Sequence, residues 1–141
     1  MAWRIDPLEA RPEPAATLRL LVVDDELEFA SIIKIVAADA GFDVRIVGSS
    51  AEFEEALEDW RPAVITLDMV MPGRDGLELL SVLSQRAFDG RIVIISGMDP
   101  THLHMAATIA TVKKLRLAAT VTKPFFGSQL RDVFHSLTHT A

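Results

Sequence analysis

Three aspartates come directly after two apolar runs of the chain. Asp24 and Asp25 follow the run 20–23 (LLVV), and Asp68 follows the run 64–67 (VITL). In an alternating α/β chain such runs are parallel strands whose carboxyl ends meet at one edge of the sheet, so we expect the three carboxylates in one cleft. Carboxylates this close repel one another unless protons or a hard cation hold them, and Mg²⁺ prefers oxygen ligands of this kind. The acids therefore predict a magnesium site.

A hydroxyl and an ammonium group are expected at the same edge. Ser96 follows the run 91–95 (RIVII), and Lys123 lies just beyond the run 117–121 (LAATV) and before Pro124. Both kinds of donor can bind phosphoryl oxygens. Added to the three acids, they indicate a phosphoryl-transfer site without a nucleotide pocket.

Each of these residues also has a purely structural interpretation. Asp25 stands where a residue often caps the helix that follows, and the pair Ser96-Gly97 is also ordinary turn chemistry. Lys123 could be an ordinary surface lysine. Asp68 is the hardest to explain structurally, because an aspartate that ends an apolar strand enters a mostly apolar sheet without an obvious partner in the sequence. The functional interpretation therefore depends most on Asp68.

The apolar runs alternate with segments of helical periodicity. Short runs rich in Val, Ile and Leu are typical of buried parallel strands. Five βα units with right-handed crossovers predict an α/β fold, a flavodoxin-like doubly wound five-stranded parallel sheet of order 2-1-3-4-5 with helices on both faces. Its ligand crevice lies between strands 1 and 3, which carry the acids. The expected strands are 19–23, 43–47, 63–67, 91–95 and 117–121.

Each helix is expected to bury one apolar face against this sheet. The first should begin after the acidic pair and end at Gly41, and the second should follow Ser49-Ser50 and end before Pro62. The expected inward residues are Phe29, Ile33, Val36 and Ala40 in the first helix, Phe53, Ala56 and Leu57 in the second, Leu79, Leu80 and Leu83 in the third, and Leu130, Val133, Phe134 and Leu137 in the last.

At these motifs the chain resembles the receiver domain of two-component response regulators, over roughly residues 18–139. The resemblance implies that Asp68 is the phosphorylated residue. It also implies that Asp24, Asp25, Asp68 and the backbone carbonyl of Val70 hold Mg²⁺, and that Ser96 and Lys123 contact the phosphoryl group, with a cis bond usual before Pro124. The motifs that carry it are Asp24-Asp25, Asp68, Met71-Pro72-Gly73, Ser96-Gly97 and Lys123-Pro124-Phe125.

The resemblance also implies partners. The phosphoryl donor would be a phosphohistidine of a sensor histidine kinase or a histidine phosphotransfer protein, as in a phosphorelay. Phosphorylation would switch contacts with an effector, or with a second copy of the chain, through the face of the fourth helix, the fifth strand and the last helix. Thr120 departs from the family pattern, which usually has an aromatic switch residue there, so the route of the output stays open. A weaker likeness is to receivers attached to cyclic-di-GMP phosphodiesterase domains.

The expected chemistry is limited to the protein's own modification, so we do not expect an enzyme that turns over a separate substrate. Val70 and Met98 are apolar at positions, two beyond Asp68 and Ser96, where many receivers carry polar groups that help to orient a hydrolytic water. This pattern predicts slow autodephosphorylation.

Two alternatives remain. One is a receiver-like interaction module that phosphorylation does not control, although the acids, hydroxyl and lysine are all present. The other is a phosphatase of the haloacid dehalogenase type, which also forms an aspartyl phosphate. Its Asp-x-Asp signature differs from the adjacent Asp24-Asp25, and a cap domain would not fit in 141 residues.

Composition agrees with a cytoplasmic signalling domain. The 141 residues, of which 50% are hydrophobic, suit one domain with an ample core. The net charge of −6 argues against direct nucleic-acid binding, and no apolar run is long enough for membrane insertion. There are no cysteines, which suits a reducing compartment. Residues 1–17 are proline-rich and charged and are expected to be a flexible extension, followed by a receiver domain over 18–139 and no output domain.

Overall fold

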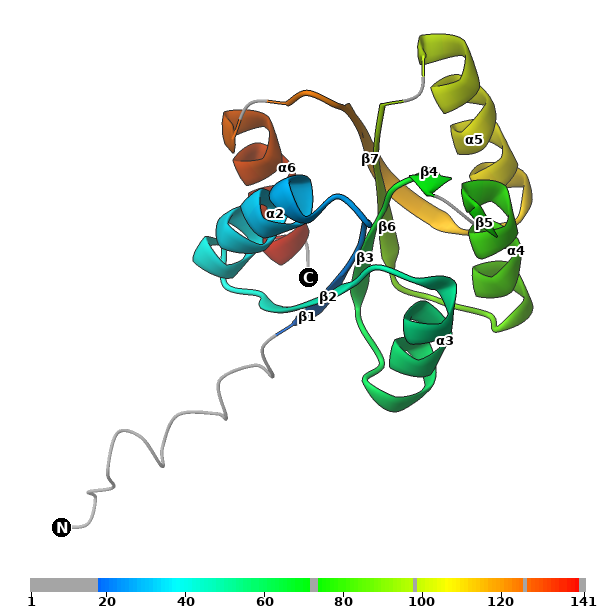
Figure 1. Cartoon of the computed structure of the whole chain (residues 1–141), viewed down its shortest axis with the longest axis horizontal. Coiled ribbons are helices and arrows are strands. Elements are labelled where there is room, and N and C mark those ends of the chain that lie inside the picture. The colour runs from blue at the N-terminus through cyan, green and yellow to red at the C-terminus, as the bar shows by residue number, and fades with distance from the viewer. Residues whose placement is uncertain (1–17, 72–73, 98, 126, 140–141) are drawn as a thin grey trace, which may run out of the picture.

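The computed structural model describes residues 18–71, 74–97, 99–125 and 127–139. The predicted extension over residues 1–17 lies outside these ranges, as do Pro72 and Gly73 of the Met71-Pro72-Gly73 motif, and Met98. Figure 1 shows the arrangement of the elements.

The central layer is a five-stranded parallel sheet in the order β2-β1-β3-β6-β7. Counting only these five strands along the chain gives the order 2-1-3-4-5, so the predicted topology is confirmed. The apolar runs identified the strands correctly because a buried parallel strand needs apolar residues on both faces. The strands are β1 (Arg19–Val23), β2 (Asp43–Val47), β3 (Val64–Leu67), β6 (Arg91–Ser96) and β7 (Arg116–Thr122).

Helices cover both faces of the sheet. Helices α2 and α6 pack on one face, and α3, α4 and α5 pack on the other (Figure 1). Each helix runs back from the carboxyl edge of the sheet toward the amino edge, as parallel crossovers require. The helices are α2 (Leu27–Asp39), α3 (Ser50–Asp59), α4 (Gly76–Gln85), α5 (Pro100–Val112) and α6 (Gly127–His139).

The two cores follow the alternation of side chains along the strands. Leu21 and Val23 of β1 face the core under α3, α4 and α5, whereas Leu20 and Val22 face the core under α2 and α6. All four are at most 1% exposed, so the middle of the sheet is dry. The polar side chains that end β1 and β3 are therefore forced toward the edge of the sheet.

The inward face predicted for the first helix is partly confirmed: Ile33 is fully buried, and Val36 and Ala40 are partly buried and pack against the core. The prediction missed Ala30 and Ala37, which are fully buried, and was wrong for Phe29, which is only half-buried. Small alanines on the inward side let the helix approach the strands closely, and the larger side chains flank the contact. The inward faces predicted for α3, α4 and α6 agree with the structure, with Leu57 and Val133 at their margins.

A short hairpin after β3 was not predicted. Strands β4 (Val70–Met71) and β5 (Arg74–Asp75) pair antiparallel, and such short strands leave no periodic signal in the sequence. Asp75 then caps α4 by accepting a hydrogen bond from the Leu77 N–H at 3.0 Å. The hairpin links the residues that follow Asp68 directly to the start of a core helix.

No helix among the described residues is long and apolar enough to cross a membrane.

The fold predicts different responses at two glycines. A Cβ atom on Gly90 would lie 2.3 Å from the Ala63 carbonyl oxygen, whereas a Cβ atom on Gly127 meets nothing within 4 Å. We expect Gly90→Ala to lower the free energy of unfolding by about 1–3 kcal/mol because backbone atoms must move. Gly127→Ala is the matched control and should change it by less than about 0.5 kcal/mol. Urea denaturation followed by circular dichroism measures both, and equal values for the two variants would contradict the packing described here.

Candidate functional site

Asp68 directly follows β3, the central strand of the sheet, and its side chain is 2% exposed. Its Oδ1 atom accepts hydrogen bonds from the Ser96 hydroxyl at 3.2 Å and from the Val70 N–H at 3.0 Å. Its Oδ2 atom accepts from Lys123 Nζ at 3.2 Å. Residues from the ends of β3, β6 and β7 therefore converge on one buried carboxylate.

Asp24 and Asp25 lie beside Asp68, at the end of β1. One carboxylate oxygen from each of the three residues lies within 4.8 Å of the others. Asp24 is buried and Asp25 is exposed, so the cluster opens to solvent on one side. The convergence predicted from topology is confirmed, because β1 and β3 are hydrogen-bonded neighbours.

The acidic cluster fits a hard divalent cation. Asp24 Oδ1 accepts a hydrogen bond from the Glu26 N–H at 2.8 Å. Asp24 Oδ2 is buried without an aligned hydrogen bond, although Lys123 Nζ lies 2.9 Å away. A buried, incompletely satisfied carboxylate oxygen beside two more carboxylates is the donor set that such a cation takes, with waters on its open side.

Lys123 follows β7, and its side chain is 6% exposed. Its ammonium group lies 2.7 Å from Glu26 Oε1, 2.9 Å from Asp24 Oδ2 and 3.2 Å from Asp68 Oδ2. The Lys123 N–H donates to the Ser96 carbonyl at 2.9 Å, and the bond to Pro124 is cis, as the resemblance implied. One cation thus contacts three carboxylates.

The pKa values of these groups reflect burial and charge. Burial alone would lower the pKa of Lys123, but the hydrogen bond to Glu26, the close contact with Asp24 and the charge of Asp68 outweigh it, so the pKa is raised and the ammonium is charged at neutral pH. Burial raises the pKa of Asp24, and the close Lys123 ammonium and the hydrogen bond from the Glu26 N–H offset only part of this effect. The Asp24 carboxylate therefore carries an electrostatic cost in the folded protein.

Two residues of the site were missed from the sequence. Glu26 is the nearest partner of Lys123, and the only signal for it is its place directly after the acidic pair. Phe29 was expected in the core, but its ring centroid lies 4.4 Å from Lys123 Nζ and 5.5 Å from the ring of Phe125. A cation over an aromatic face is stabilised by the ring quadrupole.

Val70 makes its observed contact with Asp68 through its N–H, and the residue is 60% exposed. The role of its carbonyl as a metal ligand stays a prediction. The other predicted site residues, Asp24, Asp25, Asp68, Ser96 and Lys123, are all brought together by the fold.

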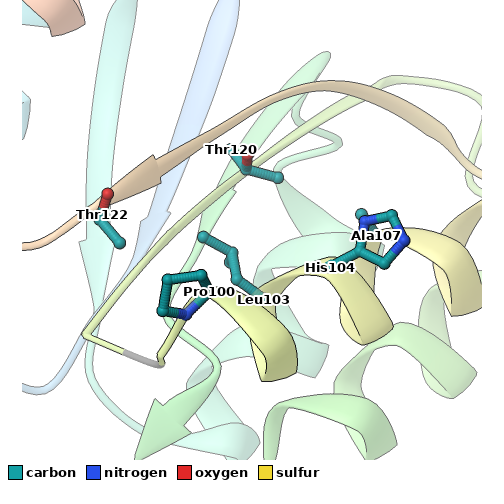
Figure 2. A pocket seen from close by; sticks show the side chains of 6 residues that line it. All are labelled: Pro100, Leu103, His104, Ala107, Thr120 and Thr122. Carbon is teal, nitrogen blue, oxygen red and sulfur yellow. The ribbon is translucent and has the colours of Figure 1, made fainter.

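A groove of about 240 Å³ lies beside the site, between α5 and β7. Figure 2 shows the helix side chains facing the strand side chains across it. It contains none of the predicted site residues, but it ends at Thr122, directly before Lys123. Its lining is Pro100, Leu103, His104, Ala107, Thr120 and Thr122.

The sequence profile of the response regulator receiver domain matches residues 20–135 of the chain. The chain belongs to the response regulator receiver family. The matched segment includes every residue of the site and all five strands of the sheet except Arg19, the first residue of β1.

Two curated relatives illustrate how far this similarity extends. The DNA-binding response regulator MtrA of Mycobacterium tuberculosis H37Rv is 35% identical over 84 residues, which are 59% of this chain and 36% of that protein. The chemotaxis protein CheY of Listeria monocytogenes is 33% identical over 87 residues, which are 57% of this chain and 69% of that protein. The chain therefore matches well under half the length of the DNA-binding regulators.

Solved receiver structures share the fold over most of the chain. A response regulator receiver domain from Bermanella marisrubri superposes with a TM-score of 0.71 at 30% identity, covering 86% of this chain and 98% of that one. A response regulator from Colwellia psychrerythraea gives a TM-score of 0.79 at 26% identity, covering 89% of this chain and all of that one (100%). Both support the assignment of a receiver fold.

The raised pKa of Asp24 predicts that this site residue lowers the stability of the receiver domain. The charged carboxylate destabilises the fold at neutral pH, so we expect Asp24→Asn to raise the free energy of unfolding by about 0.5–2 kcal/mol at pH 7. The gain should begin to shrink below the raised pKa and vanish below the ordinary aspartate pKa of about 3.9, where the carboxyl is protonated in both states. Asp25→Asn, at the exposed acid of the same cluster, should change stability by less than about 0.5 kcal/mol.

Chemical denaturation of the wild type and both variants, from pH 7 down to the lowest pH at which the wild type stays folded, measures these differences. A loss of stability in Asp24→Asn at pH 7 would show that the carboxylate is a net stabiliser and would contradict this account.

Proposed function

We propose that Asp68 accepts a phosphoryl group from a phosphohistidine of a sensor histidine kinase or a histidine phosphotransfer protein. The observation that carries the proposal is the set of contacts around one buried carboxylate. Asp68 lies 3.2 Å from both the Ser96 hydroxyl and the Lys123 ammonium, and within 4.8 Å of the oxygens of Asp24 and Asp25. Membership of the receiver family supports the same chemistry.

The carboxylates of Asp24, Asp25 and Asp68, with the Val70 carbonyl, would hold Mg²⁺. The ion supplies positive charge that offsets the charge of the transferring group. The incompletely satisfied Asp24 Oδ2 atom supports this role, because a second cation beside Lys123 would complete its contacts. The exposure of Asp25 leaves an open side for water and for the incoming phosphoryl group.

In the proposed transfer an Asp68 carboxylate oxygen attacks phosphorus in line with the scissile P–N bond. The new O–P bond forms as the P–N bond breaks, and the electron pair returns to the imidazole nitrogen of the donor. Lys123 and Ser96 supply an ammonium and a hydroxyl to the phosphoryl oxygens, so positioning and electrostatics provide the rate. The protein modifies itself, and we propose no other catalytic activity.

The phosphorylated state is proposed to be long-lived. Val70 is 60% exposed near Asp68, and its apolar side chain offers no polar group to orient a hydrolytic water. The prediction of slow autodephosphorylation also relied on Met98, which lies outside the described residues.

The proposed readout is a shift between two arrangements of the loops that follow β3 and β6. A phosphoryl group on Asp68 would draw the Ser96 hydroxyl toward itself and change the face formed by α5, β7 and α6. Thr120 is exposed and lines the groove of Figure 2, so this part of the face presents a hollow where the family usually has an aromatic side chain. An effector or a second copy of the chain is the proposed partner of that face.

An interaction module that phosphorylation does not control would have the same fold. That alternative does not explain why Lys123 and Asp68 are in contact. The family match and the adjacent Asp24-Asp25 pair do not support a haloacid dehalogenase-type phosphatase. We propose the cytoplasm as the compartment, which suits a chain without cysteines.

Intact-mass spectrometry tests the proposal. Incubation with acetyl phosphate and Mg²⁺ should add one phosphoryl group to the wild type, and the added mass should persist after acetyl phosphate is removed. Asp68→Asn should gain none, because it lacks the acceptor carboxylate, and chelation of Mg²⁺ by EDTA should suppress the gain in the wild type. An unmodified wild type would favour the phosphorylation-independent module. Equal modification of Asp68→Asn would show that another residue accepts the phosphoryl group and would contradict the assignment of Asp68.

A further inference from the structure

The local structure of helix α2 does not explain why a glutamate stands at position 26. Glu26 occupies the N-cap of α2, where Ser, Thr, Asp and Asn are preferred, and its side chain makes no capping hydrogen bond. The carboxylate instead extends to Lys123 Nζ at 2.7 Å, across 97 positions of sequence. The contact joins the start of α2 to the segment that follows β7.

The three acids around Lys123 differ in how firmly they are held. The side chains of Asp24 and Asp68 are each 2% exposed, and each accepts a backbone N–H from two residues further along the chain. The Glu26 side chain is 53% exposed, and Lys123 is its contact among the described residues. Glu26 is therefore the partner that can release the ammonium without unpairing a buried charge.

We infer that Glu26 is a positioning residue that restrains Lys123 before phosphorylation and competes with the phosphoryl group for its ammonium. The inference rests on the proposed function of Asp68. The Glu26 carboxylate neutralises part of the positive charge that would otherwise attract phosphoryl oxygens. The ammonium already donates to Asp68 Oδ2 at 3.2 Å, so phosphoryl transfer then requires it to leave Glu26 for the phosphoryl oxygens. The Phe29 ring, 4.4 Å away, continues to support its charge.

Removal of the Glu26 charge should therefore act in opposite directions on anions and cations. In Glu26→Gln the positive charge of Lys123 is less neutralised. The variant should therefore bind a phosphoryl mimic more tightly, and its Lys123 should repel a neighbouring cation more strongly. A variant that merely loosened the fold would weaken both. Glu28 provides a matched control, because it lies in the first turn of the same helix and is exposed. Among the described residues, the ion pairs of Lys123 go to Asp24, Glu26 and Asp68 and not to Glu28.

Isothermal titration calorimetry with beryllofluoride at saturating Mg²⁺, and with Mg²⁺ alone, measures both effects. We expect Glu26→Gln to bind beryllofluoride about fivefold more tightly than the wild type, the factor expected for one partly exposed ion pair, and to bind Mg²⁺ more weakly. Glu28→Gln should stay within about twofold of the wild type in both titrations. Thermal unfolding of each variant reports whether the fold is intact.

Unchanged or weaker beryllofluoride binding by Glu26→Gln would overturn the inference, as would an equal gain in Glu28→Gln, which would indicate a general charge effect. The wild type and Asp68→Asn separate this result from the parent proposal. If the wild type binds no more beryllofluoride than Asp68→Asn, the phosphoacceptor assignment fails. If the wild type binds and Glu26→Gln matches it, only the role of Glu26 fails.

Discussion

A single ammonium group holds the negative edge of this sheet together. Asp24, Glu26 and Asp68 all lie within 3.2 Å of Lys123 Nζ, and two of these acids are buried. Without a cation, buried carboxylates this close would have to be protonated or moved apart. The strand order provides this cation. Strands β1 and β3, which precede the buried acids, are neighbours, and Lys123 reaches the acids across β6 from the end of the edge strand β7.

The carboxylates are positioned by the same local device at both strands. Asp24 accepts the N–H of Glu26, and Asp68 accepts the N–H of Val70, in each case two residues further along. These Asx turns fix the carboxylates as the strands end, and the Ser96 hydroxyl donates to the same Asp68 oxygen as the Val70 N–H. The other oxygens, Oδ2 of Asp24 and Oδ2 of Asp68, face Lys123 and can accept a cation. A site prepared in this way needs little rearrangement when charge arrives, which is the main source of rate in phosphoryl transfer.

Much of this arrangement could be predicted from the sequence, because it depends on short local patterns of apolar and polar residues. Apolar runs identified the strands, and the doubly wound topology then placed Asp24, Asp25, Asp68, Ser96 and Lys123 at one edge. The contact between Glu26 and Lys123 could not be predicted, since it depends on the rotamers of two long side chains 97 positions apart. Phe29 was misplaced for a related reason: helical periodicity indicated an inward face but missed that the stripe centres on Ala30, Ile33 and Ala37.

A Mg²⁺ titration followed by backbone amide NMR tests the account most directly, because the amides of Glu26 and Val70 donate to the proposed metal-binding carboxylates. The account predicts that these two signals shift saturably, while those of Ala87 and Lys114, at the ends of α4 and α5 on the opposite edge of the sheet, stay unchanged. Shifts confined to the opposite edge, or none at the amides of Glu26 and Val70, would contradict a cation site built from Asp24, Asp25 and Asp68.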